Sequence, residues 1–355
     1  MKSIKINKKV ISEKHPTYFI ADISANHDGS LNKAKELIHM ASEAGANAAK
    51  FQNFFAKTIV SDVGFRKLKK KFSHQKNWKK SVYQVYKKAE LPIEWTSELN
   101  KTCKKYKIDY FTAPYDYNLI NYLNKFVCAW KVGSGDINWH ESILQMAKTK
   151  KPILIATGAS NLSEVKNTIN KVKKFNDKIV LMQCNTNYTA SKKNFSYINL
   201  NVLKSFKKTF NNCILGLSDH TFGHETVLGA ISLGARVIEK HFTDDNRRIG
   251  PDHKFSMNPK TWRYMIDASR NLENALGNGI KIIEQNEKDT VILQRRAIRV
   301  NREIKKGEYI KKNDLICLRP CPKGSIEPYD IKKIINKRAK KTLYYHQHLT
   351  PKDII

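Results

Sequence analysis

Short apolar runs alternate with amphipathic stretches over the first 280 residues of the chain. The runs are rich in Val, Ile and Phe, as expected of strands that are buried on both faces. The predicted strands are 18–23, 46–51, 110–113, 129–132, 153–156, 179–183, 214–217 and 237–240. Between the runs, apolar residues recur at the three- and four-residue spacing of an amphipathic helix. The predicted helices are 31–44, 92–106, 118–124, 141–148, 162–175, 200–210, 225–233 and 259–276.

A strand–helix alternation repeated eight times predicts a (β/α)₈ barrel, the TIM-barrel fold of the α/β class. The competing architecture is a doubly wound open sheet, but no Gly-x-Gly-x-x-Gly turn follows the first predicted strand. Beyond the glycines at 277 and 279 and a polar stretch, the chain changes to short strands and turns. We therefore expect a TIM-barrel domain over residues 1–280, and a linker with a small β-rich domain over residues 281–355.

The chain is strongly basic, with 65 Lys and Arg against 32 Asp and Glu and a formal charge of +33. Such a charge favours binding to nucleic acid or to an anionic membrane surface. However, 53 of the basic residues are Lys and only 12 are Arg, and dense runs occur only at 67–71 and 332–341. Clustered Arg with interleaved aromatic residues is more typical of proteins that read nucleic acid. We therefore expect a lysine-rich solvated surface, with neither a nucleic-acid nor a membrane partner.

The location is predicted from three further features of the sequence. No apolar run approaches the ~18 residues of a membrane span, and the first ten residues, MKSIKINKKV, lack the apolar stretch of a signal peptide. The six cysteines are widely spaced, and the closest pair, Cys317 and Cys321, is separated by three residues rather than the two of common zinc and redox motifs. A cytoplasmic protein with reduced thiols is expected.

Polar and ionisable side chains stand at the ends of most predicted strands. They are Asp22 at the first strand, Lys50 and Gln52 at the second, Lys131, Ser134 and Asp136 at the fourth, Thr186 and Tyr188 at the sixth, Ser218 and His220 at the seventh, and His241 at the eighth. The carboxyl ends of the strands meet at one face of a (β/α)₈ barrel, where its active site lies. The sequence therefore predicts an active site at this face.

Two histidines of this set are candidate metal ligands. His220 and His241 end the adjacent seventh and eighth strands, where neutral imidazoles can converge on one divalent ion. A single histidine is more often an ordinary core or surface residue, but the paired placement favours a metal site. Water and a substrate oxygen would complete the coordination shell, which suits a Lewis acid that polarises a carbonyl.

Another group of predicted site residues would bind a compact dianion such as phosphate. These are the lysines Lys50 and Lys131, the hydroxyls of Ser134 and Ser218, and the backbone amides of residues 133–135. A lysine inside a barrel mouth is costly unless an anion accompanies it. The alternative is that a lysine pairs with Asp22 or Asp136. These two carboxylates are also candidates for proton transfer or for holding sugar hydroxyls.

The motifs around these residues resemble those of the sialic acid synthases, the N-acetylneuraminate synthase family. They are FIADISANHDGS, AAKFQNF, YFTAPYD, WKVGSGDINW, ILIATGAS, QCNTNYTA, LGLSDHTFG, VIEKHFTDD and GPDHKFSM, with RRAIRVNREIKKGE and LRPCPKGSIEP beyond the linker. The resemblance extends from about residue 18 to residue 355. It implies a TIM barrel followed by an antifreeze-like (SAF) domain, and a homodimer in which that domain reaches over the partner's barrel mouth.

The resemblance also implies an activity and a role for each matched residue. The family condenses phosphoenolpyruvate with N-acetylmannosamine, an amino-sugar aldehyde, and water, giving N-acetylneuraminate and phosphate. His220 and His241 would hold manganese or magnesium. The matched catalytic positions are Asp22, Lys131, His220 and His241. The positions that hold phosphoenolpyruvate are Lys50, Lys131, Ser134 and Ser218. The positions that contact the sugar are Gln52, Asp136, Tyr188, Asp252 and, from the neighbouring subunit, Arg319.

The chain departs from the family pattern at several of these positions. Asp22 and Asp136 stand where Glu is more common, which shortens each carboxylate by one methylene. Ala113 and Ala156 stand where a hydroxyl residue often helps to hold the phosphate or carboxylate. The nearby hydroxyls that would replace them are those of Thr112, Thr157 and Thr186, and we count Thr186 among the substrate-binding residues.

Two alternative functions remain open. Within the same chemistry, the chain would be a legionaminic or pseudaminic acid synthase that takes a diacetamido 6-deoxy sugar. The sequence leaves the acceptor open because one or two pocket residues are enough to discriminate an N-acetyl or deoxy position by ~1–3 kcal/mol. In a different class, it would be a basic module that binds nucleic acid or polysaccharide, which predicts strongly salt-dependent binding.

Overall fold

The computed structural model describes residues 2–68, 75–76 and 78–355 of the chain. Part of the basic run at 67–71 lies outside the described residues. The chain divides into two compact units, Met1–Gly277 and Asn278–Ile355. The division falls close to residue 280, where the sequence pattern changes.

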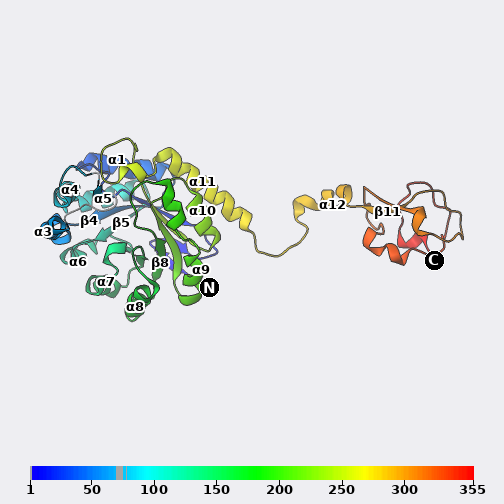
Figure 1. Cartoon of the computed structure of the whole chain (residues 1–355), viewed down its shortest axis with the longest axis horizontal. Helices are drawn as coiled ribbons and strands as arrows, with labels where there is room; N and C mark the ends of the chain where they lie inside the picture. The colour runs from blue at the N-terminus through cyan, green and yellow to red at the C-terminus, as the bar shows by residue number, and fades with distance from the viewer. Residues whose placement is uncertain (1, 69–74, 77) are drawn as a thin grey trace. The chain divides into compact units, whose positions relative to one another are not determined.

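Eight parallel strands of the first unit form a closed barrel (Figure 1). They are β3 (Tyr18–Asp22), β4 (Ala48–Asn53), β5 (Asp109–Pro114), β6 (Trp130–Val132), β7 (Ile153–Ala156), β8 (Ile179–Cys184), β9 (Ile214–Asp219) and β10 (Val237–His241). Neighbouring strands follow the chain order, and β10 closes the barrel against β3 with His241 opposite Asp22. The eight predicted runs are these strands, with ends that differ by at most two residues. The predicted TIM barrel is confirmed.

An antiparallel hairpin that the apolar pattern did not predict precedes the barrel. Its strands are β1 (Ile4–Ile6) and β2 (Lys9–Ile11). Ile4, Ile6 and Ile11 are buried in one cluster with Tyr18 and Val237, which are the first residues of β3 and β10. The hairpin therefore covers the amino ends of the barrel strands, opposite the end at which the candidate site lies.

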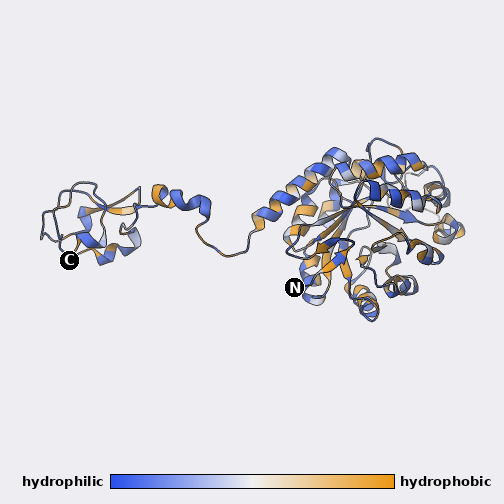
Figure 2. Cartoon of the chain, turned by 180° about the vertical axis from the view of Figure 1, so that it is seen from behind, coloured by the Kyte–Doolittle hydropathy of each residue, from blue (hydrophilic) through white to orange (hydrophobic). Residues whose placement is uncertain are grey.

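Amphipathic helices surround the barrel and connect its strands (Figures 1 and 2). They are α1 (Leu31–Glu43), α2 (Ala56–Ile59), α3 (Asp62–Lys67), α4 (Val82–Ala89), α5 (Trp95–Lys105), α6 (Ile120–Leu123), α7 (His140–Lys148), α8 (Leu162–Lys173), α9 (Val202–Thr209), α10 (Glu225–Ser232) and α11 (Pro259–Leu276). Short 3₁₀ helices are η2 (Tyr117–Leu119), η3 (Ser134–Asp136), η4 (Lys192–Tyr197) and η5 (His253–Phe255). Helices α2, α3 and α4 follow β4 and were not predicted. None of the helices in the described parts of the chain is long and apolar enough to cross a membrane.

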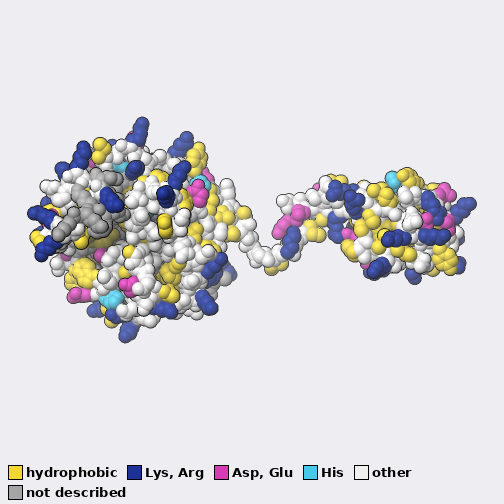
Figure 3. Space-filling model, in the orientation of Figure 1, with side chains coloured by type: hydrophobic (Ala, Val, Ile, Leu, Met, Phe, Trp, Pro, Cys, Tyr) yellow, Lys and Arg dark blue, Asp and Glu magenta, His cyan; other side chains and the backbone are white. Residues whose placement is uncertain are grey.

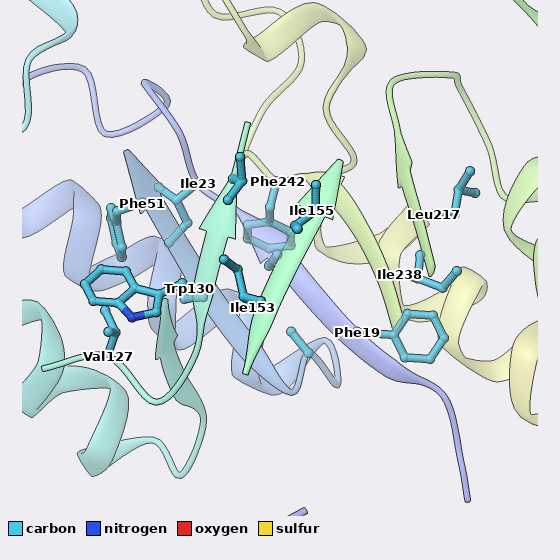
Figure 4. Close-up of a cluster of buried hydrophobic side chains, with 14 of the residues drawn as sticks. Phe19, Ile23, Phe51, Val127, Trp130, Ile153, Ile155, Leu217, Ile238 and Phe242 are labelled. Atoms are coloured by element: carbon cyan, nitrogen blue, oxygen red, sulfur yellow. The ribbon is translucent and has the colours of Figure 1, made fainter. Parts of the chain in front are cut away.

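The main hydrophobic core lies between the barrel and its helices (Figure 4). Trp130 of β6 and Trp262 of α11 are fully buried, and Phe51 of β4 and Ile155 of β7 belong to the same cluster. Full burial of one large apolar side chain contributes ~1.5–3 kcal/mol. This packing holds the strands, and therefore the side chains at their carboxyl ends, in fixed positions.

The second unit is small and has few strands. Its elements are η6 (Gln285–Glu287), α12 (Lys288–Gln294), β11 (Ala297–Val300), η7 (Lys312–Asp314), β12 (Leu315–Leu318), η8 (Pro328–Lys333) and η9 (Pro351–Asp353). Strands β11 and β12 pair in antiparallel fashion. A separate core that contains Ile298, Val300, Ile310 and Leu343 supports them. The unit therefore has its own hydrophobic centre.

The Lys and Arg side chains are spread over the visible faces of both units, among acidic and uncharged side chains (Figure 3). This distribution agrees with the lysine-rich solvated surface that the sequence predicts.

Candidate active site

A cavity of about 460 Å³ lies at the carboxyl ends of the barrel strands. The predicted site residues that line it are Gln52, Ser134, Asp136, Thr186, Tyr188, His241 and Asp252. They come from different strands and loops, separated by up to 200 residues in the sequence. The barrel therefore brings together most of the side chains that the strand-end pattern selected.

Two lysines meet a carboxylate inside the barrel. Lys131 Nζ lies 3.0 Å and Lys50 Nζ 3.5 Å from Glu239 Oε1. Ser218 Oγ donates to the same oxygen at 3.1 Å, and Lys50 Nζ also lies 2.6 Å from Asp22 Oδ2. All of these side chains are buried. Lys50 therefore lies beside Asp22, one of the two carboxylates considered as lysine partners, and Glu239 is a further partner of both lysines.

Glu239 and Lys50 are held in their charged forms. Burial alone would raise the pKa of Glu239, but the charges of Lys131 and Lys50 lower it to about 2. Burial would lower the pKa of Lys50, but Asp22 and Glu239 raise it above its ordinary value. An ammonium group has three N–H donors, and among the described residues Lys131 Nζ forms an ion pair with one carboxylate. The lysines therefore retain N–H groups that can donate to a bound anion.

The two predicted metal ligands lie next to each other. The ring centroids of His220 and His241 are 5.3 Å apart, and the ring of Tyr188 packs edge-on against both. His220 Nδ1 lies 2.8 Å from the carbonyl oxygen of Asn185, so the nitrogen at Nε2 is the one with a free lone pair. Burial and the nearby His241 lower the pKa of His220 to about 3. His220 is therefore neutral at physiological pH, as a metal ligand must be.

The histidine pair fits a divalent metal ion. His241 Nε2 lies 3.4 Å from Asp22 Oδ2, and its Nδ1 is buried with no hydrogen-bond partner among the described residues. A buried polar atom without a partner is costly, and a ligand would remove that cost. The described residues contain no cluster of three or more His, Cys, Asp or Glu side chains that could hold a metal ion. An ion held by the two histidines would therefore keep coordination positions for water or substrate.

Two further carboxylates border the cavity. Asp252 Oδ2 accepts a hydrogen bond from Ser24 Oγ at 2.5 Å and lies 3.9 Å from His241 Nδ1. Burial raises the pKa of Asp136 to about 6. Ser134 Oγ, two residues before Asp136, accepts from the amide of Gly158 at 3.0 Å, so its own hydroxyl hydrogen can donate to a ligand. The cavity thus offers both hydrogen-bond donors and acceptors.

The structure separates the three threonines proposed to replace the missing hydroxyls. Thr112 Oγ1 lies 2.6 Å from Asn53 Oδ1, and Thr157 Oγ1 donates to the carbonyl of Met182 at 2.9 Å. Both hydroxyls are therefore engaged within the sheet, whereas Thr186 lines the cavity. Arg319 belongs to the second unit, where its Nε donates to the carbonyl of Gln294 at 2.6 Å.

The strand-end pattern missed Glu239. It lies on β10 two residues before His241, so both side chains point to the same face of the strand. This two-residue spacing was the available signal, because a buried acid needs a cationic partner and the neighbouring Lys240 points to the opposite face of the strand. The pattern also missed the apolar residues that α2 and α4 place at the cavity.

Comparison with known proteins identifies the family. Residues 37–281 match the NeuB family and residues 295–355 match the SAF domain. The chain belongs to the NeuB family. This confirms the predicted resemblance to the sialic acid synthases and the predicted SAF domain.

The relatives of this NeuB-family chain include synthases of different sugar acids. It is 35% identical to the N,N'-diacetyllegionaminic acid synthase of Campylobacter jejuni, covering 91% of this chain and 97% of the relative. It is 32% identical to a pseudaminic acid synthase of C. jejuni, covering 95% and 96% of the two chains. The fold is also similar to the crystal structure of N-acetylneuraminic acid synthetase from Leptospira borgpetersenii in complex with citrate, with a TM-score of 0.71 at 25% identity. That match covers 82% of this chain and 95% of the Leptospira chain. The chain is thus an enzyme of the sugar-acid synthase type.

Proposed function

We propose that this NeuB-family enzyme condenses phosphoenolpyruvate with an N-acetylated amino-sugar aldehyde and water, releasing phosphate and a sugar acid three carbons longer. N-Acetylmannosamine would give N-acetylneuraminate, and a diacetamido 6-deoxy sugar would give legionaminic or pseudaminic acid. The observation that supports this reaction is the convergence of Lys50 and Lys131 on Glu239, beside the histidine pair.

The lysines would bind the phosphate and carboxylate groups of phosphoenolpyruvate. Charge-assisted hydrogen bonds to such groups are about twice as strong as neutral ones. Glu239 holds both ammonium groups in place before the substrate arrives, so little reorganisation accompanies binding. Ser134 and Ser218 would donate further hydrogen bonds to the same substrate.

The acceptor would occupy the adjoining cavity. Gln52, Asp136, Tyr188 and Asp252 would orient its hydroxyl and amide groups there, with the aldehyde near the histidines. The carbon–carbon double bond of phosphoenolpyruvate then supplies the electron pair with which its carbon 3 attacks the aldehyde carbon. The carbonyl electron pair moves onto the aldehyde oxygen, which becomes an alkoxide. The acids Asp22 and Glu239 would stabilise the cationic character left at carbon 2. Water adds to that carbon, and Asp22 would accept one of its protons and pass it to the alkoxide. The second proton leaves with phosphate as the bond from carbon 2 to the phosphate oxygen breaks and carbon 2 becomes a ketone.

His220 and His241 would hold a divalent ion, manganese or magnesium. When bound, such an ion acts as a Lewis acid on the aldehyde carbonyl. The neutral state of His220 and the unpartnered Nδ1 of His241 support this assignment.

The active form would be a homodimer in which Arg319 contacts the acceptor in the neighbouring subunit's barrel. Complementation tests this arrangement, because Arg319→Ala and His241→Ala chains, each inactive alone, should regain activity when they are unfolded and refolded together. Absence of any regained activity in the mixed dimer would exclude a shared site.

Phosphate release tests the proposed reaction. The purified enzyme is incubated with phosphoenolpyruvate, manganese and either N-acetylmannosamine or its diacetamido 6-deoxy analogue. We expect phosphate only when an acceptor is present, and mass spectrometry should detect a product three carbons longer. The proposal is wrong if no aldehyde of this class supports phosphate release.

A further inference from the structure

Tyr115 brings a hydroxyl group into the cavity that the proposed reaction does not use. The residue directly follows β5, and its backbone amide donates to the carbonyl of Asn53 on β4 at 2.9 Å. Its side chain lines the cavity together with Ser134 and Asp136. Ala113, two residues earlier and on the same side of the strand, has no polar group in its side chain. Tyr115 therefore supplies the hydrogen-bonding side chain at the carboxyl end of β5.

Gly133 leaves room for this hydroxyl. A Cβ atom on Gly133 would lie 2.4 Å from Tyr115 Oη, far closer than two atoms in van der Waals contact. The backbone of Gly133 has φ −66° and ψ 148°, a conformation that any residue adopts. The glycine is therefore needed for space and not for backbone freedom. The phenol oxygen lies directly against the segment 133–135, which the sequence predicts to bind an anion.

The Tyr115 hydroxyl is available to a ligand. It forms no hydrogen bond to any residue that the structure describes. Burial raises the pKa of this phenol well above its ordinary value, and so do the charges of three carboxylates, Asp136, Asp22 and Glu239. The group therefore stays protonated at physiological pH and has one O–H to donate.

The surroundings of this hydroxyl favour an anion as its ligand. Lys131, two residues before Gly133, extends its ammonium group from the same interior side of the chain. Ser134 Oγ accepts from the amide of Gly158 at 3.0 Å, so its own hydrogen can donate to a ligand. One ammonium and two hydroxyl groups can thus approach a single ligand. A phosphate group has three terminal oxygens to receive them, and charge-assisted hydrogen bonds to it are strong.

We propose that Tyr115 is a binding residue for phosphoenolpyruvate, and that its hydroxyl donates to a terminal phosphate oxygen beside Lys131 and Ser134. This inference rests on the proposed function and adds a further donor to its phosphate site. The same hydrogen bond holds inorganic phosphate until the product leaves. Tyr115 therefore sets the affinity for the phosphate group and not the affinity for the acceptor sugar.

Tyr115→Phe tests this contact because it removes only the hydroxyl oxygen. In a steady-state assay with an amino-sugar aldehyde, we expect KM for phosphoenolpyruvate to rise about tenfold, as for the loss of one hydrogen bond to a charged group. KM for the aldehyde should stay unchanged. Calorimetric titration with inorganic phosphate, without metal or aldehyde, should show a similar rise in Kd. An unchanged KM for phosphoenolpyruvate, or a rise in KM for the aldehyde instead, overturns the proposal.

Tyr122→Phe is the matched control. Tyr122 lies on α6, is 39% exposed, and does not line the cavity. This variant should leave both KM values and the Kd for phosphate unchanged. Thermal unfolding followed by circular dichroism shows whether each variant folds. If Tyr115→Phe does not, Gly133→Ala decides, because its added methyl group displaces the hydroxyl and should raise KM for phosphoenolpyruvate in the same way.

A hydroxyl returned to the same side of the strand tests whether the lost donor causes the effect. In the double variant Tyr115→Phe with Ala113→Ser, we expect KM for phosphoenolpyruvate to recover in part. Absence of any recovery would attribute the effect to packing of the ring, and the proposal would be wrong.

Binding of inorganic phosphate separates this contact from the proposed reaction. If no aldehyde supports phosphate release but Tyr115→Phe still weakens phosphate binding, the reaction is wrong and the Tyr115 contact stands. If phosphate is released but Tyr115→Phe binds phosphate as tightly as the natural protein, the contact is wrong and the reaction stands.

Discussion

Lys240 Nζ lies 2.5 Å from Asp219 Oδ2, and the two residues are direct neighbours in the register of β9 and β10. Thr226 of α10 also donates to Asp219 Oδ2, at 2.7 Å, so the pair faces the helix layer. The next residues along the two strands are His220 and His241. A buried ion pair on the outside of the barrel therefore aligns the two strands at the point where their histidines turn inward.

Breaking this pair should destabilise the enzyme strongly. Both side chains are 1% exposed, and removing one member of a buried pair leaves an uncompensated charge that costs ~3–5 kcal/mol. We expect this loss for Lys240→Met and for Asp219→Leu, measured by urea unfolding, and a smaller loss for the double variant.

The control is Lys207→Met, which removes the exposed ion pair with Glu13. It should change the free energy of unfolding by less than ~1 kcal/mol. If the double variant loses as much free energy of unfolding as the two single variants together, the two charges are not coupled.

Lys131→Met should weaken binding of phosphoenolpyruvate. Loss of a hydrogen bond to a charged group amounts to ~1.5–3 kcal/mol, so KM for phosphoenolpyruvate should rise ten- to a hundredfold in a steady-state phosphate assay. Lys151→Met is the control, because Lys151 binds the carbonyls of Asn124 and Val127 outside the cavity. An unchanged KM in Lys131→Met would remove this lysine from the anion site.

Removal of metal should abolish turnover. After dialysis against a chelator, we expect activity to return with manganese, and manganese binding to be visible by electron paramagnetic resonance. His220→Ala and His241→Ala should lose both the bound-metal signal and turnover. His140→Ala, which removes a histidine that contacts Thr168 and Lys171 on the helix layer, should retain them. Full activity in the chelator would contradict a metal role.

Asp136 should make the stability depend on pH. Its pKa is about 6 in the folded protein against an ordinary value of 3.8. The folded state therefore holds this proton more tightly than the unfolded state, and stability falls as pH rises from about 4 to about 6. Asp136→Asn should accordingly be ~1–3 kcal/mol more stable than the natural protein at pH 7.5 and equal to it at pH 4.

The control for this pH dependence is Gln145→Ala on α7, which removes a side chain that does not ionise. Its stability difference from the natural protein should not change between pH 4 and pH 7.5. Urea unfolding at both values provides the comparison. If the stability difference between Asp136→Asn and the natural protein is also the same at both pH values, burial does not raise the pKa of this carboxyl.

The barrel was predictable because each of its strands is buried on both faces. Continuous apolar runs such as 153–156 leave few alternatives to a parallel strand, and the residues just after them then share one end of the barrel. The helices after β4 were missed because they are short. Helices α2, α3 and α4 have four, six and eight residues, so each is too short for a helical period to stand out in this polar segment.

The individual pairings inside the site depend on side-chain positions that the pattern does not contain. Lys50 comes from β4 and Lys131 from β6, yet both meet at Glu239 of β10 across the barrel interior. The strand-end pattern predicted which end of the barrel these side chains share. It could not show which carboxylate would accompany each lysine, because several acids lie within reach.

The register of β10 against β3 places His241 opposite Asp22, and these residues are separated by almost the whole length of the barrel domain. The site therefore lies on the seam where the sheet closes on itself. A chain still under synthesis, with β10 not yet docked, has Asp22, Lys50 and Lys131 but neither Glu239 nor His241. The final strand therefore completes the site, because it brings the carboxylate on which both lysines converge and the second histidine of the pair.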